Sequence, residues 1–129
     1  MRWGAGMRPA PWGGMNSTEK QTLPHHLLIA FQLAKELVQL VARTRIGHAQ
    51  LRAQARKSAV SAALNTAEGA ARESRADKSR LYAIALAEYC ECCAAVEIAG
   101  ALGACAPAHV ARVVALGTRL RDMLRKLAR

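Results

Sequence analysis

The stretch SAVSAALNTAEGAARESRADKSRLYAIA, residues 58–85, decides how this chain of 129 residues folds. Its first half is rich in alanine and serine, and alanine is the strongest helix former. Asn65, Glu68 and Gly69 then interrupt the helical pattern, and glycine takes without strain the left-handed conformation that ends many helices. We therefore predict that a helix over residues 48–68 ends at Gly69.

A second helix begins a few residues later. Ser74 is a typical N-cap residue, and Asp77 three residues on gives a variant of the capping box, with aspartate in place of glutamate or glutamine. We predict that this helix runs from about residue 74 to residue 102, where Gly100 and Gly103 close it. Pro107 then marks the first turn of a further helix, over residues 107–128.

The segment before this stretch also has helical spacing. Residues 25–43 predict a helix with two neighbouring apolar rows. The rows are Leu27, Phe31, Ala34, Val38 and Val41, and beside them Leu33, Leu37 and Leu40. No segment shows the strict alternation of a strand, so the predicted fold class is all-α, with residues 25–129 forming an antiparallel, up-down-up-down four-helix bundle. Because one row is enough for the seam of a bundle, the second row predicts self-association.

Residues 1–24 differ from the rest in composition. They hold three of the four prolines and several glycines, which predicts a flexible tail. This segment lacks the apolar core of a secretory signal. No part of the chain has the run of roughly 20 apolar residues that a membrane span needs. We therefore expect no membrane association, a cytoplasmic location and reduced cysteines.

The charge of the chain is strongly positive, with 19 lysines and arginines against 9 acidic residues. Such a balance indicates a polyanionic partner, which could be nucleic acid, an acidic protein surface or an anionic membrane. The alternative is that charge only keeps the protein soluble. We favour phosphate contacts, because basic residues gather on three segments with few acids beside them.

The candidate nucleic-acid-binding residues come from those three segments. They are Arg45, Arg52, Arg56, Lys57, Arg72, Arg75, Arg80, Arg112, Arg119, Arg121, Arg125 and Lys126. In the last predicted helix, Arg112, Arg119 and Lys126 form one stripe at steps of seven. Arg121, Arg125 and Arg129 form another at steps of four, and at about 100° per residue the two stripes flank the apolar seam on opposite sides.

No pattern in the sequence predicts catalysis, a metal or a cofactor. Cys90, Cys92 and Cys93 lie inside one predicted helix, and only Cys90 and Cys93 share a face. A zinc site needs four ligands, which Cys105 and a histidine could complete, but nothing in the sequence fixes that geometry. We favour buried, apolar cysteines over a thiol-based metal or redox site. The carboxylates lack the Glu-x-x-His pairs of di-iron bundles, so we expect a protein that is not an enzyme.

One larger pattern resembles a known family. It consists of Gln54-x-Arg56-Lys57-Ser58-Ala59-x-Ser61, then Asn65-x-Ala67-Glu68-Gly69, then Arg72-x-Ser74-x-x-Asp77-x-x-Arg80, and later Ile84-Ala85 and Glu91. This pattern resembles the four-helix-bundle family of 23S ribosomal RNA intervening-sequence proteins, which includes the accessory variability determinants of diversity-generating retroelements. The resemblance covers roughly residues 23–127.

The resemblance implies a homopentameric barrel of basic four-helix protomers without enzymatic activity. In the retroelements such a protein binds the reverse transcriptase and RNA, and it supports mutagenic cDNA synthesis. We therefore expect an oligomeric accessory protein that binds RNA or cDNA and a reverse transcriptase. The alternative is an intervening-sequence protein with an RNA-binding or structural role.

The residues that carry the resemblance form a structural signature: Asn65, Glu68, Gly69, Ser74, Asp77 and Glu91. We interpret this signature as architectural, because a carboxylate is a poor phosphate ligand. Glu68 is expected to pair with Arg72 or Arg80, and Glu91 with Asn65 or with a basic residue of segment 48–68. The alternative is that the same cluster forms a binding surface.

Overall fold

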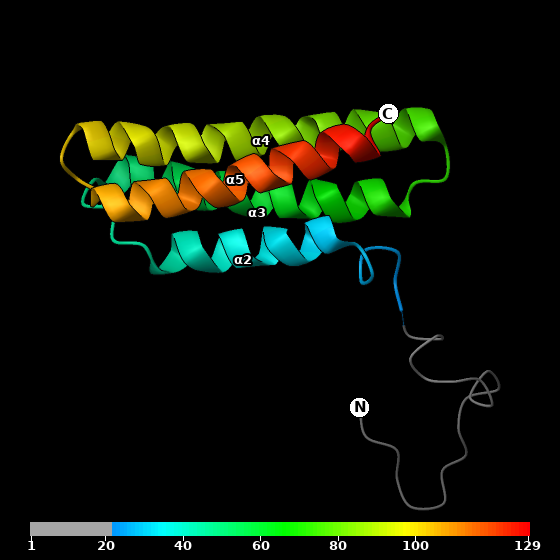
Figure 1. The fold of residues 1–129 in the computed structure, drawn as a ribbon, viewed down its shortest axis with the longest axis horizontal. Coiled ribbons are helices and arrows are strands. Elements are labelled where there is room, and N and C mark those ends of the chain that lie inside the picture. The colour runs from blue at the N-terminus through cyan, green and yellow to red at the C-terminus, as the bar shows by residue number, and fades with distance from the viewer. Residues whose placement is uncertain (1–21) are drawn as a thin grey trace, which may run out of the picture.

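The computed structural model describes residues 22–129, and this part of the chain is a bundle of four helices with no strand (Figure 1). The helices are α2 (Ile29–Arg43), α3 (Ala49–Ala71), α4 (Arg75–Ala101) and α5 (Pro107–Leu127). Each helix contacts two others, in the order α2, α3, α4, α5 and back to α2. All of the predicted tail except residues 22–24 lies outside the described residues.

The connections between the helices gather at the two ends of the bundle. Residues 44–48 and 102–106 lie together at one end, and residues 72–74 lie at the other end near the C-terminus (Figure 1). At the first end the backbone N–H of Gly47 donates to the carbonyl of Ala104 at 2.7 Å. At the second end Ser79 Oγ donates to the carbonyl of Ala128 at 2.7 Å. Each end of the bundle is thus fixed by a bond between distant segments.

The first predicted helix starts later than expected. Residues 23–28 form a turn, in which the N–H of Leu28 bonds to the carbonyl of His25 at 3.1 Å, and α2 begins only at Ile29. Leu27, the first member of a predicted apolar row, is 83% exposed. The apolar spacing that predicts the helix extends back to Leu27, but in the structure no neighbouring helix covers this residue.

Both apolar rows of α2 contribute residues to the core of the protomer. Leu33 and Leu37 of the second row are as buried as Ala34 and Val41 of the first. Because α2 contacts both α3 and α5, its apolar sector must be wide enough to meet two helices. The second row therefore does not predict self-association as we expected, because Leu33 and Leu37 are buried within the protomer and Leu40 is partly buried.

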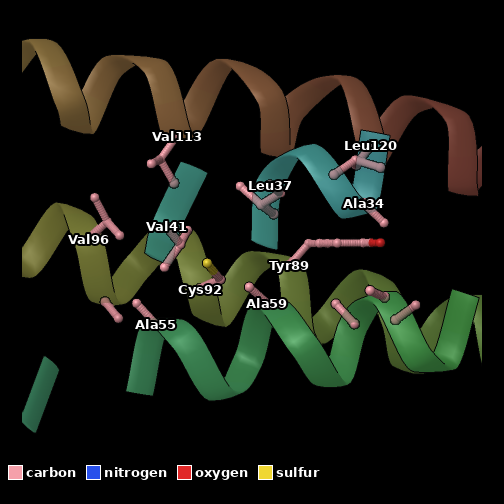
Figure 2. Close-up of a cluster of buried hydrophobic side chains, with 14 of the residues drawn as sticks. Ala34, Leu37, Val41, Ala55, Ala59, Tyr89, Cys92, Val96, Val113 and Leu120 are labelled. Carbon is pink, nitrogen blue, oxygen red and sulfur yellow. The ribbon is translucent and has the colours of Figure 1, made fainter. Parts of the chain in front are cut away.

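In the core, α3 and α4 contribute side chains of very different size (Figure 2). The buried face of α3 holds only small side chains, such as Ala55, Ala59 and Ala62. The facing helix α4 supplies larger ones, including Tyr82 and Tyr89. Small residues on one helix let the other approach closely, and α3 and α4 share the most extensive contact in the bundle.

Gly69 does not end α3, which continues for two more residues to Ala71. Gly69 is buried and helical, and among the described residues only Gly103 has a positive φ, at 73°. A Cβ at Gly69 would lie 2.7 Å from Cε1 and 2.9 Å from Cδ1 of Tyr82. The glycine is therefore needed because the Tyr82 ring packs on the backbone of α3, and our prediction of a left-handed cap there is wrong.

The turn from α3 into α4 is closed by polar contacts. Lys78 Nζ donates to the carbonyl of Ala70 at 3.0 Å and to that of Gly69 at 3.4 Å, so a cation satisfies the last carbonyls of α3. Ser74 caps α4 as predicted, accepting a bond from the N–H of Asp77 at 3.1 Å. Gly103 at the end of α4 and Pro107 at the start of α5 also lie where the sequence predicts.

A buried hydrogen bond joins α3 and α4 at their centre. Thr66 Oγ1 donates to the carbonyl of Ala62 at 2.8 Å and lies 2.9 Å from the hydroxyl of Tyr89. Since the threonine has one hydroxyl hydrogen, Tyr89 is the donor of the second bond. Burial raises the pKa of Tyr89 to about 12, so its hydroxyl keeps that hydrogen throughout the physiological range.

Gly69→Ala should destabilise the bundle by about 1–3 kcal/mol, because the new methyl group meets the Tyr82 ring in a packed core. Urea unfolding followed by circular dichroism measures the change. Gly47→Ala is the control, since a Cβ there lies at an ordinary 3.6 Å from its nearest neighbour. Equal stability of Gly69→Ala and the parent protein would contradict this account.

Thr66→Val should cost about 1–3 kcal/mol, because it leaves the Tyr89 hydroxyl buried without an acceptor. The double variant Thr66→Val, Tyr89→Phe removes both partners, and its loss of unfolding free energy should be clearly smaller than the sum of the two single losses. Additive losses would show that the two hydroxyl groups do not depend on each other.

Candidate nucleic-acid interface

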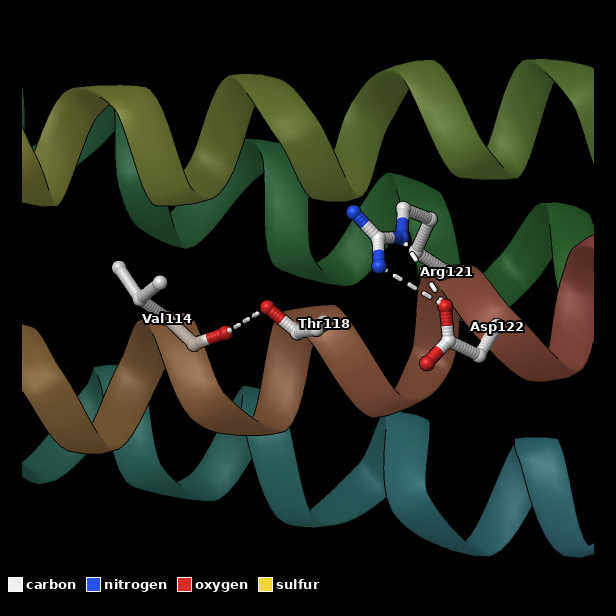
Figure 3. Close-up of polar contacts among 4 residues, drawn as sticks. All are labelled: Val114, Thr118, Arg121 and Asp122. Carbon is white, nitrogen blue, oxygen red and sulfur yellow. Dashed lines mark hydrogen bonds and ion pairs between the residues drawn. The ribbon is translucent and has the colours of Figure 1, made fainter.

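Most basic side chains of the described region have no acidic partner. Residues 22–129 contain two ion pairs, Arg72 with Glu68 at 2.9 Å and Arg121 with Asp122 at 3.0 Å. In the second pair both Nε and Nη2 of Arg121 donate to one oxygen of its neighbour Asp122 (Figure 3). Both pairs are exposed, and such pairs contribute little to stability. The other basic side chains of this region therefore carry positive charge that no carboxylate neutralises.

Three of these arginines border one groove, between α2 and α5. The groove has a volume of about 400 Å³ and contains Arg43, Arg112 and Arg119. Its other lining residues are Glu36, Gln39, Leu40, Ala115 and Leu116. Arg112 and Arg119 are two helical turns apart on α5, a rise of about 10.5 Å. Arg43 lies in the last turn of α2, so guanidinium groups stand on both sides of the groove.

Arg43 is not among the basic residues predicted from the sequence, because residues 25–43 were interpreted only by their apolar rows. Glu36, Gln39 and Arg43 follow one another at steps of three and four, which places them on one face of the helix. That spacing, applied to polar residues, was the signal that could have found Arg43.

The predicted basic residues at the start of α3 have structural roles. Arg52 Nη1 donates to the carbonyl of Ile46 at 2.9 Å, and Arg56 Nη2 donates to the carbonyl of Ala42 at 3.1 Å. These bonds hold the connection between α2 and α3. Arg45 and Lys57 are exposed nearby, and their side chains form no hydrogen bond or ion pair within the described residues.

The remaining predicted basic residues lie away from the groove. Arg72, Arg75 and Arg80 are exposed around the connection between α3 and α4. The bond from Ser79 to Ala128 brings the end of α5, with Arg125 and Lys126, to this same end of the bundle. Arg121 lines a different hollow, between α5 and α4. The structure therefore divides the predicted residues among several surfaces.

The signature residues make partly different contacts from those we expected. Glu68 pairs with Arg72, one of its two predicted partners. Glu91 accepts a hydrogen bond from Gln54 and not from Asn65, whose amide donates to the carbonyl of Ser61 at 3.0 Å. The prediction for Glu91 fails because residue 65 lies about three helical turns from residue 54, the position of α3 that Glu91 reaches.

The four cysteines are reduced and differ in exposure. Cys92 and Cys105 are buried, Cys93 is partly buried and Cys90 is exposed, so the expectation of buried cysteines is wrong for Cys90. Burial raises the pKa of the Cys92 thiol to about 12 and that of Cys93 to about 11. Gly117 on α5 leaves room for the Cys93 sulfur. In the described region, no three His, Cys, Asp or Glu residues are placed to hold a metal ion.

A comparison with protein families identifies a match for most of this chain. The family model described as 23S rRNA-intervening sequence protein matches residues 27–126, a range that begins just before α2 and ends in the last turn of α5. The search of curated proteins found no match. In addition, no helix within residues 22–129 combines the length and the apolar character needed to cross a membrane.

The cysteines should differ in reactivity, because the thiolate is the species that reacts. At about pH 8 a thiol of pKa 11 is ionised in only about one molecule in a thousand. An alkylating reagent should therefore label Cys90 first, with Cys92, Cys93 and Cys105 labelled slowly, as mass spectrometry of peptides can show. Denatured protein, in which all four should react, is the control. Labelling of Cys92 at the rate of Cys90 would contradict the described packing.

Proposed function

We propose that this chain, which belongs to the 23S rRNA-intervening sequence protein family, is a non-enzymatic RNA-binding protein. The observation that carries the proposal is the groove between α2 and α5, where Arg43, Arg112 and Arg119 have no carboxylate within ion-pair distance. Guanidinium groups bind phosphate through two parallel hydrogen bonds, and such contacts need no particular base. The protein then needs no catalytic residue and no cofactor.

The proposed assembly is a homo-oligomer of antiparallel, up-down-up-down protomers in the cytoplasm, with five copies as the family resemblance implies. Its support is the apolar surface of α3 and α4. Val60 and Leu64 on α3 are 45% and 65% exposed, and Ile84 and Ile98 on α4 are 39% and 52% exposed. Exposed large apolar side chains on these two adjacent helices favour burial against another subunit.

A second candidate is the role of accessory protein in a diversity-generating retroelement, which would bind RNA or cDNA and a reverse transcriptase during mutagenic cDNA synthesis. The observation that favours it is the separation of the basic surfaces. Arg112 and Arg119 line the groove, whereas Arg75 and Arg80 lie near the other end of the bundle. Two surfaces could hold a nucleic acid and a second partner at once. Co-purification with a reverse transcriptase, with and without RNA, distinguishes the two candidates.

Replacing Arg43, Arg112 and Arg119 together by Gln should weaken binding to single-stranded RNA and make it less dependent on salt. Each lost phosphate contact lowers the slope of log affinity against log salt by roughly 0.7, so the slope should fall by about 2. Titration of labelled RNA at several salt concentrations measures it.

The matched comparison is the triple variant Arg72→Gln, Arg75→Gln, Arg80→Gln, which removes the same charge at the far end of the bundle. Circular dichroism must show that both variants keep their helices. A full loss of slope in this second variant, with none in the first, would place RNA at the end of the bundle and not in the groove.

A further inference from the structure

The arginine groove also contains groups that phosphate binding does not explain. Glu36 and Gln39 of α2 line the groove, and both side chains are exposed. Neither forms an ion pair or a side-chain hydrogen bond with another described residue. A carboxylate repels phosphate, so a groove used only for phosphates would be better without Glu36.

The same two residues continue into a second hollow on α2. This hollow, of about 370 Å³, is lined by Gln32, Lys35, Glu36 and Gln39. Glu36 and Gln39 therefore stand between the arginines of the groove on one side and Lys35 on the other. An RNA strand whose phosphates contact the groove arginines and Lys35 would place its bases near the Glu36 carboxylate and the Gln39 amide.

The apolar part of the groove offers a surface for a base. Leu40 and Leu116 are partly buried and line the groove between the charged residues. A base in an RNA duplex cannot reach such a site, because its pairing edge is occupied and its major groove is too narrow for side chains. An unstacked base of a single strand can lie on the leucines and direct its edge towards α2.

We propose that this groove holds an unpaired nucleotide of single-stranded RNA and prefers a base with an exocyclic amino group, from which the Glu36 carboxylate accepts a hydrogen bond. At position 4 of the pyrimidine ring, a carboxylate accepts from the N4 amino group of cytosine but is repelled by the O4 carbonyl of uracil. This inference rests on the proposed RNA binding and adds to it the kind of strand and base.

The test uses two single-stranded RNAs of equal length, one of cytidine and one of uridine, which differ at the group that Glu36 should contact. Fluorescence anisotropy at one salt concentration gives the two dissociation constants. The parent protein should bind the cytidine RNA about fivefold more tightly, the lower end of what a base-edge contact contributes. Glu36→Gln should bring this ratio close to one, because an amide both donates and accepts.

Glu97→Gln is the matched control, since it removes the same charge from an exposed glutamate of α4, outside the groove. It should keep the fivefold ratio. Equal affinities of the parent protein for the two RNAs would overturn the inference. So would a Glu36→Gln variant that binds both RNAs more tightly by the same factor, because the carboxylate would then only repel phosphate.

The two proposals can fail separately. If the parent protein binds neither RNA, the proposed function is wrong and the base preference falls with it. If both RNAs bind equally and the triple arginine variant loses both, RNA binding stands and only the base preference is overturned.

Discussion

The close approach of α3 and α4 is the constraint on which the rest of the bundle depends. It requires a helix with almost no side-chain volume on its inner face, and α3 provides alanines and Gly69 where α4 brings Tyr82 and Tyr89. An approach this close buries the hydroxyl groups of Thr66 and Tyr89, and the hydrogen bond between them gives each a partner. The pair is therefore matched both in volume and in hydrogen bonding.

The other two helices are arranged around this pair, and their own contact is the least extensive in the bundle. Leu40 of α2 and Leu116 of α5 are only partly buried, and both line the arginine groove between these two helices. The tight seam lies on one side of the bundle and the open groove on the opposite side. Cations can gather at the groove because the core does not need that surface for packing.

Local signals in the sequence predicted the fold well, and long-range ones did not. Ser74 and Pro107 act on backbone within a few residues, so their roles could be inferred without knowing what packs nearby. Gly69 could not be assigned in this way, because the reason for it is a tyrosine on another helix. The predicted partner of Glu91 was wrong for the same reason, because the offset between α3 and α4 along the bundle decides which residue of α3 Glu91 reaches. At the groove, Arg112 and Arg119 were predicted from their stripe. Arg43 lies on a polar face of α2 that the sequence also shows, but only the packing of α2 against α5 places it beside the other two arginines.

The position of the groove also sets when it forms. α3 and α4 are consecutive, so their contact closes a short loop and can form early, whereas residues 44–106 separate α2 from α5 along the chain. The bond between Gly47 and Ala104 likewise waits for distant segments to meet. During synthesis the arginines of α2 and α5 face each other only after the last helix has left the ribosome. The surface that we assign to RNA is thus completed last, and a partly made chain lacks it.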